Sequence, residues 1–414
     1  MNAPSGGRKI TKFADTVLAN LALFPFTSKS DTAFSGDGWE VTGGQAVNTL
    51  AGNDVVTGTT TTTGGLYGIS ISGSSTLDTG DGNDVVTGTG LLGGIIIGDG
   101  EFITGGTLDT GCGNDVVTGT AVEATSNGIG LAVGSTLDTG KGNDVVTGTA
   151  GSFGIENFGT INTGAGNDAI SGSGGGIGIY NFGTINSGTG NDTITGRSSG
   201  SSITVSGGSF GIENLGAIDT GAGNDAITGN GGGDENTNIG IYSEGTINTG
   251  AGNDAITGSV CGDGIFNFGI ENEGTINTGA GNDAITGSVG GDGDGIFNIG
   301  IFNNGTINTG AGNDTVDALQ GGFGGNGTIN LGAGKDTLKG FGTGTFNGGD
   351  GTDRILFGEG VYEITGSTIT SSTITGIMNV TGFENIGGAS GGLFSFTDGT
   401  LAVDNSGNAT FVVS

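Results

Sequence analysis

Short apolar segments recur along this chain, and within each one large apolar residues alternate with small or polar residues. In the 24-residue stretch that begins at Gly154, GIENFGTINTGAGNDAISGSGGGI, these segments are GIEN, GTINT and DAIS. Alternation with a period of two is typical of β-strands. The groups NFG and TGAGN between the segments have turn chemistry, because glycine readily adopts positive φ angles. We therefore expect three short strands in each repeat, joined by turns.

The repeats follow one another at intervals of 17 to 33 residues. Three short strands cannot bury a core alone, but stacked coils can, because each coil covers the one below it. The pattern predicts an all-β fold, a parallel β-solenoid (β-roll or β-helix) of about twelve coils. Two inward columns are expected, one with Ile161, Ile185, Ile218, Ile247, Ile276 and Ile307, and one with Val56, Val86, Val117, Val146, Ile170, Ile194, Ile227, Ile256 and Ile285.

We expect three parts: an N-terminal segment or cap over residues 1–45, solenoid repeats over 46–356, and a β-rich C-terminal cap over 357–414. The stretch ADTVLANLALFPF predicts a short amphipathic capping helix over residues 11–24. Arg8, Lys9 and Lys12 lie before or at the start of this stretch, so a cleaved signal peptide is the alternative, which Asp15 disfavours. The stretch is too short to cross a membrane as a helix.

The composition narrows the classes of partner. The chain has 41 acidic and 9 basic residues among 414, a formal net charge of −32, and no histidine. Nucleic acids and anionic membranes both require clustered Lys and Arg, so we expect neither as a partner. The absence of histidine removes the commonest general base and the commonest zinc ligand. Cations are the partners that this charge favours.

An aspartate recurs in the turn of every repeat, within GxGND or a close variant. Stacking the coils in register places these carboxylates about 5 Å apart, so either their pKa values rise or cations lie between them. A carboxylate and the carbonyl groups of a tight turn form an oxygen cage that suits Ca²⁺ better than Mg²⁺. The alternative is that GND is only a turn. The candidate metal ligands are Asp54, Asp84, Asp115, Asp144, Asp168, Asp192, Asp225, Asp254, Asp283, Asp314, Asp336, Asp350 and Asp353.

The turn resembles the RTX, or haemolysin-type, calcium-binding nonapeptide G-G-x-G-x-D-x-U-x, where U is large and apolar. GGDGTDRIL over Gly348–Leu356 fits this pattern, and most other copies have Thr in place of the first Gly. The resemblance implies a parallel β-roll with Ca²⁺ between turns, type I secretion and a role outside the cell. RTX nonapeptides usually run in tandem, whereas here one occurs per coil. We therefore expect calcium along one edge of a three-sided solenoid.

The C-terminal region adds to this resemblance. VTGFENIGG over Val380–Gly388 is similar to the segment that often follows RTX arrays, and the final FSFTDGTLAVDNSGNATFVVS resembles an uncleaved type I secretion signal. The resemblance implies an extracellular or cell-surface location.

A second polar column precedes the turn. We expect it to form a hydrogen-bonded ladder, and a second set of calcium ligands in the early coils is the alternative. It contains Asp78, Asp109, Asp138 and Asp219, with Asn162, Asn186, Asn248, Asn277 and Asn308 in the other coils.

Three functions are compatible with these features. The leading hypothesis is a secreted, calcium-ordered structural protein of an adhesin, surface layer or extracellular filament, with self-assembly or cell-surface polysaccharide as further partners. An enzyme acting on polysaccharide is disfavoured because the repeats have few basic residues, and Arg354 beside Asp353 and Asp350 forms only one local cluster. An ice-binding solenoid is the third hypothesis, with an outward array of Thr from the INT and ITG strands.

Overall fold

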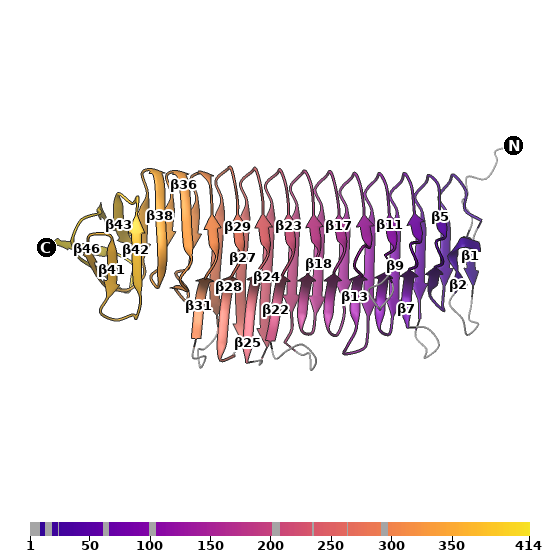
Figure 1. The fold of residues 1–414 in the computed structure, drawn as a ribbon, viewed down its shortest axis with the longest axis horizontal. Helices are drawn as coiled ribbons and strands as arrows, with labels where there is room; N and C mark the ends of the chain where they lie inside the picture. The colour runs from indigo at the N-terminus through magenta and orange to yellow at the C-terminus, as the bar shows by residue number, and fades with distance from the viewer. Residues whose placement is uncertain are drawn as a thin grey trace. The chain divides into compact units, whose positions relative to one another are not determined.

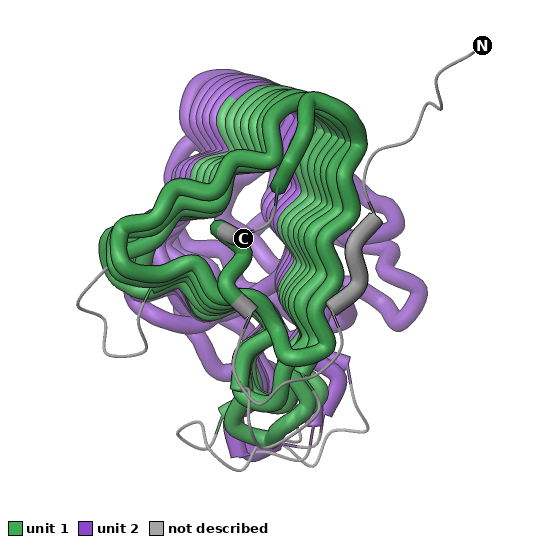
Figure 2. Tube along the Cα trace, turned by 90° about the vertical axis from the view of Figure 1, so that its right-hand side faces the viewer, with its two compact units in different colours: residues 1–221 green, residues 222–414 purple. Residues whose placement is uncertain are grey.

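The computed structural model describes residues 9–12, 19–23, 25–60, 66–98, 105–200, 208–233, 236–262, 264–290 and 297–414. The chain divides into two compact units, Met1–Gly221 and Ala222–Ser414, and each is described by itself (Figures 1 and 2). Within each unit, parallel strands from successive coils stack into three sheets, A, B and C. The predicted all-β parallel β-solenoid is therefore confirmed.

Unit 1 has parallel strands in all three sheets. Sheet A contains β1 (Lys9–Lys12), β3 (Thr32–Ser35), β6 (Val55–Thr59), β9 (Val85–Gly90), β12 (Val116–Ala121), β15 (Val145–Thr149), β18 (Ala169–Gly174) and β21 (Thr193–Ser198). Sheet B contains β2 (Ala19–Asn20), β4 (Trp39–Val41), β7 (Tyr67–Ile71), β10 (Gly93–Ile97), β13 (Asn127–Leu131), β16 (Phe153–Asn157), β19 (Ile177–Asn181) and β22 (Gly208–Asn214). Sheet C contains β5 (Ala46–Asn48), β8 (Thr76–Asp78), β11 (Thr107–Asp109), β14 (Thr136–Asp138), β17 (Thr160–Asn162), β20 (Thr184–Asn186) and β23 (Ala217–Asp219).

Unit 2, taken by itself, has the same three-strand plan. Its sheet A contains β24 (Ala226–Gly233), β27 (Ala255–Gly262), β30 (Ala284–Gly290), β34 (Thr315–Asp317), β37 (Thr337–Lys339), β39 (Arg354–Phe357), β43 (Asn385–Gly388) and β44 (Leu393–Ser395). Its sheet B contains β25 (Thr237–Ser243), β28 (Phe266–Asn272), β31 (Phe297–Asn303) and β35 (Phe323–Gly324). Its sheet C begins with β26 (Thr246–Asn248), β29 (Thr275–Asn277), β32 (Thr306–Asn308), β33 (Ala311–Gly312), β36 (Thr328–Gly334) and β38 (Gly344–Gly351).

The C-terminal end of unit 2 changes from parallel to antiparallel pairing. β38 and β39 still pair in parallel with β42 and β43. The antiparallel pairs are β40 with β41 and β45, β41 with β42, β43 with β44, and β45 with β46. The strands not yet given are β40 (Gly360–Thr365), β41 (Thr368–Ser371), β42 (Ile377–Thr381), β45 (Gly399–Val403) and β46 (Ala409–Val413).

The core consists of columns of aliphatic side chains that repeat once per coil. Both predicted inward columns are confirmed, because all fifteen of their side chains are at most 1 % exposed. Register keeps like residues together: Ile161 pairs with Ile185 on sheet C, and Val117 pairs with Val146 on sheet A. Each such burial contributes about 1.5–3 kcal/mol, so the alternation of apolar residues fixes which face of each strand points inward.

The turn between sheets C and A requires glycine. Gly140 has φ of 81°, and a Cβ there would lie 1.9 Å from the carbonyl oxygen of Gly111 in the neighbouring coil. A side chain at this position would therefore be strained and would clash with rigid backbone. Close stacking of coils explains why the TG pair that opens each turn recurs.

Two expectations for the N-terminal region were wrong. The helix predicted over residues 11–24 is not found in its described part, where strands β1 and β2 are followed by a three-residue 3-10 helix, η1 (Leu21–Leu23). The repeats also begin before residue 46, because β3 pairs in register with β6 and β4 pairs with β7. In the described part of this stretch, Leu21 of η1 is buried. Among the described residues, no helix is long and apolar enough to span a membrane.

Candidate functional site

Twelve of the thirteen predicted metal-ligand aspartates form one structural class. Their side chains are 0 to 2 % exposed and point into the solenoid immediately before each strand of sheet A. They are Asp54, Asp84, Asp115, Asp144, Asp168 and Asp192 in unit 1, and Asp225, Asp254, Asp283, Asp314, Asp336 and Asp353 in unit 2. Asp350 differs, because it is exposed and pairs with Ala333 at the outer position between the two turn glycines.

In unit 1 each aspartate accepts a hydrogen bond from the backbone of the aspartate one coil earlier. We call this chain of bonds the carboxylate ladder. The N–H groups of Asp54, Asp84, Asp115, Asp144 and Asp168 donate to Oδ1 of Asp84, Asp115, Asp144, Asp168 and Asp192, at 2.7, 2.8, 2.8, 2.8 and 2.9 Å.

Unit 2 has the same ladder. The N–H groups of Asp225, Asp254, Asp283, Asp314 and Asp336 donate to Oδ1 of Asp254, Asp283, Asp314, Asp336 and Asp353, at 2.8, 2.9, 2.8, 2.8 and 2.8 Å. Each bond satisfies a buried backbone donor that the turn leaves outside the strand pairing, and leaving it unmade would cost about 1–3 kcal/mol.

Two further carboxylates belong to the ladder, and the sequence patterns missed both. Asp31 donates its N–H to Oδ1 of Asp54 at 2.7 Å, and its Oδ2 accepts from the hydroxyl of Thr27 at 2.9 Å. In unit 2 the N–H of Asp353 donates to Oε2 of Glu384 at 2.8 Å. Neither residue follows GxGN, and the signal that could have revealed them is spacing, since Asp31 lies 23 residues before Asp54 and Glu384 lies 31 residues after Asp353.

The second oxygen of each carboxylate has a different environment. Thr49 and Thr110 donate their hydroxyls to Oδ2 of Asp54 and Asp115, at 2.6 and 2.7 Å. A carbonyl of the next coil competes for these hydroxyls, since Thr49 Oγ1 also lies 2.8 Å from Thr79 O, and Thr79 is directed at Thr110 O at 3.4 Å. A hydroxyl has one proton and cannot serve both acceptors fully. Oδ2 is buried and lacks a hydrogen-bond donor in Asp84, Asp144, Asp168, Asp254, Asp283, Asp314, Asp336 and Asp353.

Burial raises the pKa of ladder aspartates in both units, among them Asp84, Asp115, Asp168, Asp283 and Asp336. The pKa of Asp84 is raised to about 6 and that of Asp115 to about 7, with desolvation as the largest cause. The charge of neighbouring ladder aspartates also raises both values, while the backbone hydrogen bonds and the nearby hydroxyls of Thr79 and Thr110 lower them. An ionised, buried oxygen without a donor is costly. Each such oxygen therefore requires either a proton or a cation.

The asparagine of GND forms a second ladder on the outside of the turn. The N–H of Asn83 donates to Oδ1 of Asn53 at 2.9 Å, and the N–H of Asn114 donates to Oδ1 of Asn83 at 2.7 Å. These bonds point back to the earlier coil, whereas those of the aspartates point forward. The Asn-Asp pair thus satisfies two consecutive turn N–H groups, which explains much of its repetition.

The predicted polar column on sheet C forms partial ladders. In unit 1 Asn48 donates to Asp78 at 2.6 Å and Asn162 donates to Asp138 at 2.9 Å, while Asp109 lies between Asp78 and Asp138. Burial raises the pKa of Asp109, and the charges of Asp138 and Asp78 raise it further. In unit 2 the amides of Asn277 and Asn330 donate to Asn248 and Asn308, at 3.0 and 2.9 Å.

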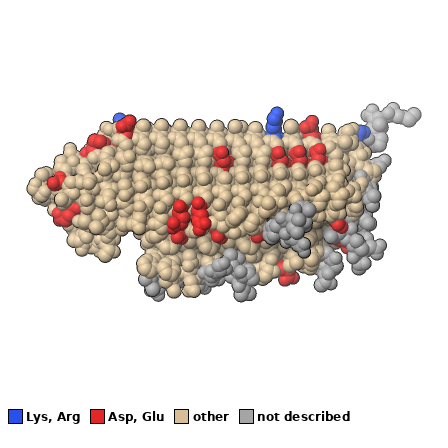
Figure 3. Space-filling model, in the orientation of Figure 1, with Lys and Arg blue, Asp and Glu red and all other residues tan. Residues whose placement is uncertain are grey.

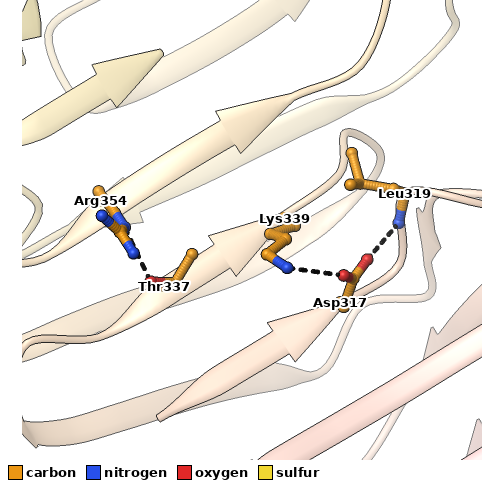
Figure 4. Close-up of polar contacts among 5 residues, drawn as sticks. All are labelled: Asp317, Leu319, Thr337, Lys339 and Arg354. Carbon is orange, nitrogen blue, oxygen red and sulfur yellow. Dashed lines mark hydrogen bonds and ion pairs between the residues drawn. The ribbon is translucent and has the colours of Figure 1, made fainter. Parts of the chain in front are cut away.

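The residues do not form a preassembled multi-carboxylate metal centre. Among the described residues, no group of three or more His, Cys, Asp or Glu is placed to hold an ion. The predicted cluster of Asp350, Asp353 and Arg354 does not face one site, because Asp353 is buried while Asp350 and Arg354 are exposed. Figure 4 shows that Arg354 Nε donates to Thr337 Oγ1 at 2.9 Å and that Lys339 Nζ pairs with Asp317 at 3.0 Å.

Comparison with known proteins gives little beyond the geometry. No family model matches the chain, and no curated protein matches it. One solved structure that is similar is described as the "X-ray crystal structure of a hyperactive, Ca2+-dependent, beta-helical antifreeze protein from an Antarctic bacterium". The identity is 19 %, the match covers 83 % of this chain and 86 % of that chain, and the TM-score is 0.41. A likeness of this size establishes neither a shared structure nor a shared activity.

Proposed function

We propose that this chain is a non-enzymatic, calcium-binding structural solenoid that works outside the cell. The observation that supports the proposal is the column of buried Oδ2 atoms without hydrogen-bond donors. Carboxylate and carbonyl oxygens are the ligands that Ca²⁺ prefers. A cation at these oxygens would offset both the burial of charge and the repulsion between neighbouring coils.

The oxygen atoms available in each turn limit how an ion would bind. Oδ1 of each ladder aspartate already accepts a backbone N–H, so Oδ2 is the oxygen left for an ion, together with turn carbonyls. Few carboxylates per ion favour weak binding, of roughly 10⁻⁴–10⁻³ M as in extracellular modules. Calcium would then order the repeats outside the cell, where it is abundant. Inside the cell, where it is scarce, the repeats would stay unfolded for export.

The finer parts of the proposal come from the resemblance to RTX repeats. They are type I secretion, a location outside the cell or at its surface, and a role in an adhesin, surface layer or filament. Self-assembly and binding of cell-surface polysaccharide belong to the same proposal. The net charge of −32 supports calcium as the partner and disfavours nucleic acid.

The test is calcium binding by the full chain with a matched pair of variants. Isothermal titration with Ca²⁺, with Mg²⁺ as the control ion, is carried out on the wild type, Asp283→Asn and Asp350→Asn. Both variants remove one charge from unit 2, but only Asp283 belongs to the ladder. We expect Asp283→Asn to lose calcium sites and Asp350→Asn to keep them. Equal binding by all three proteins, or no binding by the wild type, contradicts the proposal.

Ice binding is a second candidate, favoured by one surface of unit 1. Sheet A presents two outward threonine columns in register, separated by inward glycine. Coils about 4.8 Å apart and strand positions two residues apart make this a regular array of hydroxyl and methyl groups. The columns contain Thr57, Thr87, Thr118 and Thr147, and Thr59, Thr89, Thr120 and Thr149.

Inhibition of ice recrystallisation tests this candidate. Thr118→Tyr places a large ring in the threonine array of sheet A, and Thr107→Tyr places the same ring on the outward side of sheet C. If sheet A binds ice, wild type and Thr107→Tyr are active and Thr118→Tyr is not. Inactive wild type, or equal loss in both variants, excludes sheet A as an ice-binding surface.

A further inference from the structure

Sheet B of unit 2 has a surface on which aromatic rings and carboxylates alternate. Tyr242 pairs in register with Glu271, and Glu271 pairs with Phe302, so one carboxylate lies between two rings on adjacent strands. Glu244 and Glu273 are exposed in the turns that follow. We call these five residues the Glu271 patch. Figure 3 shows acidic side chains gathered in groups on this face of the molecule.

Two carboxylates of the patch accept hydrogen bonds from neutral side chains. The hydroxyl of Tyr242 donates to Glu244, and Asn304 Nδ2 donates to Glu273 Oε1 at 2.7 Å. Burial, with a smaller contribution from the charge of Glu273, raises the pKa of Glu271 to about 7. A cation at the patch would stabilise these carboxylates in their ionised form.

Unit 2 does not supply that cation itself. Its sequence has three basic residues, Lys335, Lys339 and Arg354. Lys339 pairs with Asp317, and Arg354 donates to Thr337, all on strands of sheet A. Lys335 lies in the turn before β37, where it takes the place of the asparagine of GND. Among the described residues of unit 2, none of these three cations therefore forms an ion pair with a carboxylate of the Glu271 patch.

We propose that the Glu271 patch is a docking surface for an arginine-bearing segment of a partner polypeptide. A guanidinium is planar, stacks on aromatic faces and pairs with carboxylates through two parallel hydrogen bonds. Tyr242 and Phe302 provide the faces, and Glu271 and Glu273 provide the acceptors. A lysine ammonium is not planar, cannot form two parallel hydrogen bonds with one carboxylate, and is more strongly hydrated.

The same strands carry an apolar surface that extends the contact. Phe268 is buried and packs against Phe302 with ring centroids 5.4 Å apart, so it supports that ring rather than adding to the surface. At the start of β28 and β31, Phe266 and Phe297 stack at 5.1 Å and are 39 and 47 % exposed. Phe266 lies five residues before Glu271, about 16 Å along a strand. An extended segment of five or so residues reaches from the stacked pair to the patch.

Binding of labelled hexa-arginine to the full-length protein tests this inference, measured by fluorescence anisotropy at fixed calcium and physiological ionic strength. Glu271→Gln removes one charge from the patch, and Asp109→Asn removes one charge from sheet C of unit 1. Circular dichroism verifies that both variants are folded. We expect Glu271→Gln to weaken binding about tenfold and Asp109→Asn to change it less than about twofold.

Hexa-lysine and a neutral oligosaccharide are the comparison probes. We expect hexa-arginine to bind wild type at least about fivefold more tightly than hexa-lysine, because only guanidinium stacks and pairs at once. Equal binding of the two peptides, or equal losses in the two variants, would mean general attraction to an acidic protein and overturns the inference. Oligosaccharide binding that Phe302→Ala abolishes, with hexa-arginine binding unchanged, assigns the surface to sugars and also overturns it.

Discussion

The backbone N–H of Asp54 donates a 2.7 Å hydrogen bond to Oδ1 of Asp84, the equivalent residue one coil later. The N–H of Asn83, the residue before Asp84, donates in the opposite direction to Oδ1 of Asn53 at 2.9 Å. Two adjacent side chains thus satisfy two consecutive N–H groups in each turn. This relationship gives the repeated Asn-Asp pair a structural role whether or not an ion is bound.

Replacing a ladder aspartate by asparagine separates a protonated carboxyl from a calcium ligand. In Asp254→Asn the amide oxygen still accepts the N–H of Asp225, so the ladder bond is kept. If Oδ2 binds calcium, the variant loses about 1–3 kcal/mol of unfolding free energy in Ca²⁺. Urea denaturation in Ca²⁺ and in chelator measures this. A variant at least as stable as wild type, by the same margin in Ca²⁺ and in chelator, would show that the carboxyl is protonated and does not bind calcium.

The end of the ladder offers a test of the hydrogen bond alone. Glu384→Gln keeps an acceptor for the N–H of Asp353, and Glu384→Ala removes it. We expect the glutamine variant to lie within about 0.5 kcal/mol of wild type and the alanine variant to lose about 1 kcal/mol. Equilibrium denaturation measures the free energy of unfolding of both variants. Equal values would contradict a stabilising hydrogen bond from Asp353 to Glu384.

The close stacking of the turns predicts a large effect of a small substitution. Gly140→Ala places a Cβ 1.9 Å from the Gly111 carbonyl oxygen at a residue with φ of 81°. We expect a loss of more than about 2 kcal/mol, because both backbone strain and the clash must be relieved. Gly134→Ala is the control: φ there is 76°, but a Cβ meets nothing within 4 Å. Similar losses in thermal unfolding would refute the importance of coil contact.

A half-buried carboxyl on sheet B of unit 1 gives a pH-dependent prediction. Burial raises the pKa of Glu156, and the hydrogen bond from Asn127 at 2.5 Å lowers it in part. A folded pKa above the unfolded value means that this group favours the folded state at low pH and disfavours it as pH rises through the folded pKa. We expect Glu156→Gln to stabilise the protein at pH 8 relative to wild type and to change little at pH 4. Equal effects at both values would contradict the shift.

Much of the fold follows from local pattern. The alternation in GTINT and DAIS, with one apolar column per strand, predicts both the strands and the inward positions of Ile161 and Ile170. Asp31 and Glu384 could not be found this way, because they take part in the ladder hydrogen bonds although neither lies in a GxGND motif. Their role depends on register with Asp54 and Asp353, which pairing between coils determines.

The strands of the first coil and the separate roles of the two ladder oxygens could not be predicted from the sequence, for a related reason. A helical period near residues 11–24 also fits short strands that bury one side against a neighbouring coil. The sequence predicts a carboxylate in each turn. It does not predict which oxygen accepts the backbone N–H and which oxygen lacks a hydrogen-bond donor. That division depends on the direction of each hydrogen bond between coils.

Thermal unfolding followed by far-UV circular dichroism tests the central claim most directly. The full chain is heated at pH 7.5 in chelator, in millimolar Ca²⁺ and in millimolar Mg²⁺. We predict a β-signal that is weak or melts early in chelator and in Mg²⁺, and a Ca²⁺-specific rise in both signal and Tm. The same signal and the same Tm in all three solutions would show that the carboxylate ladder stabilises the solenoid without calcium.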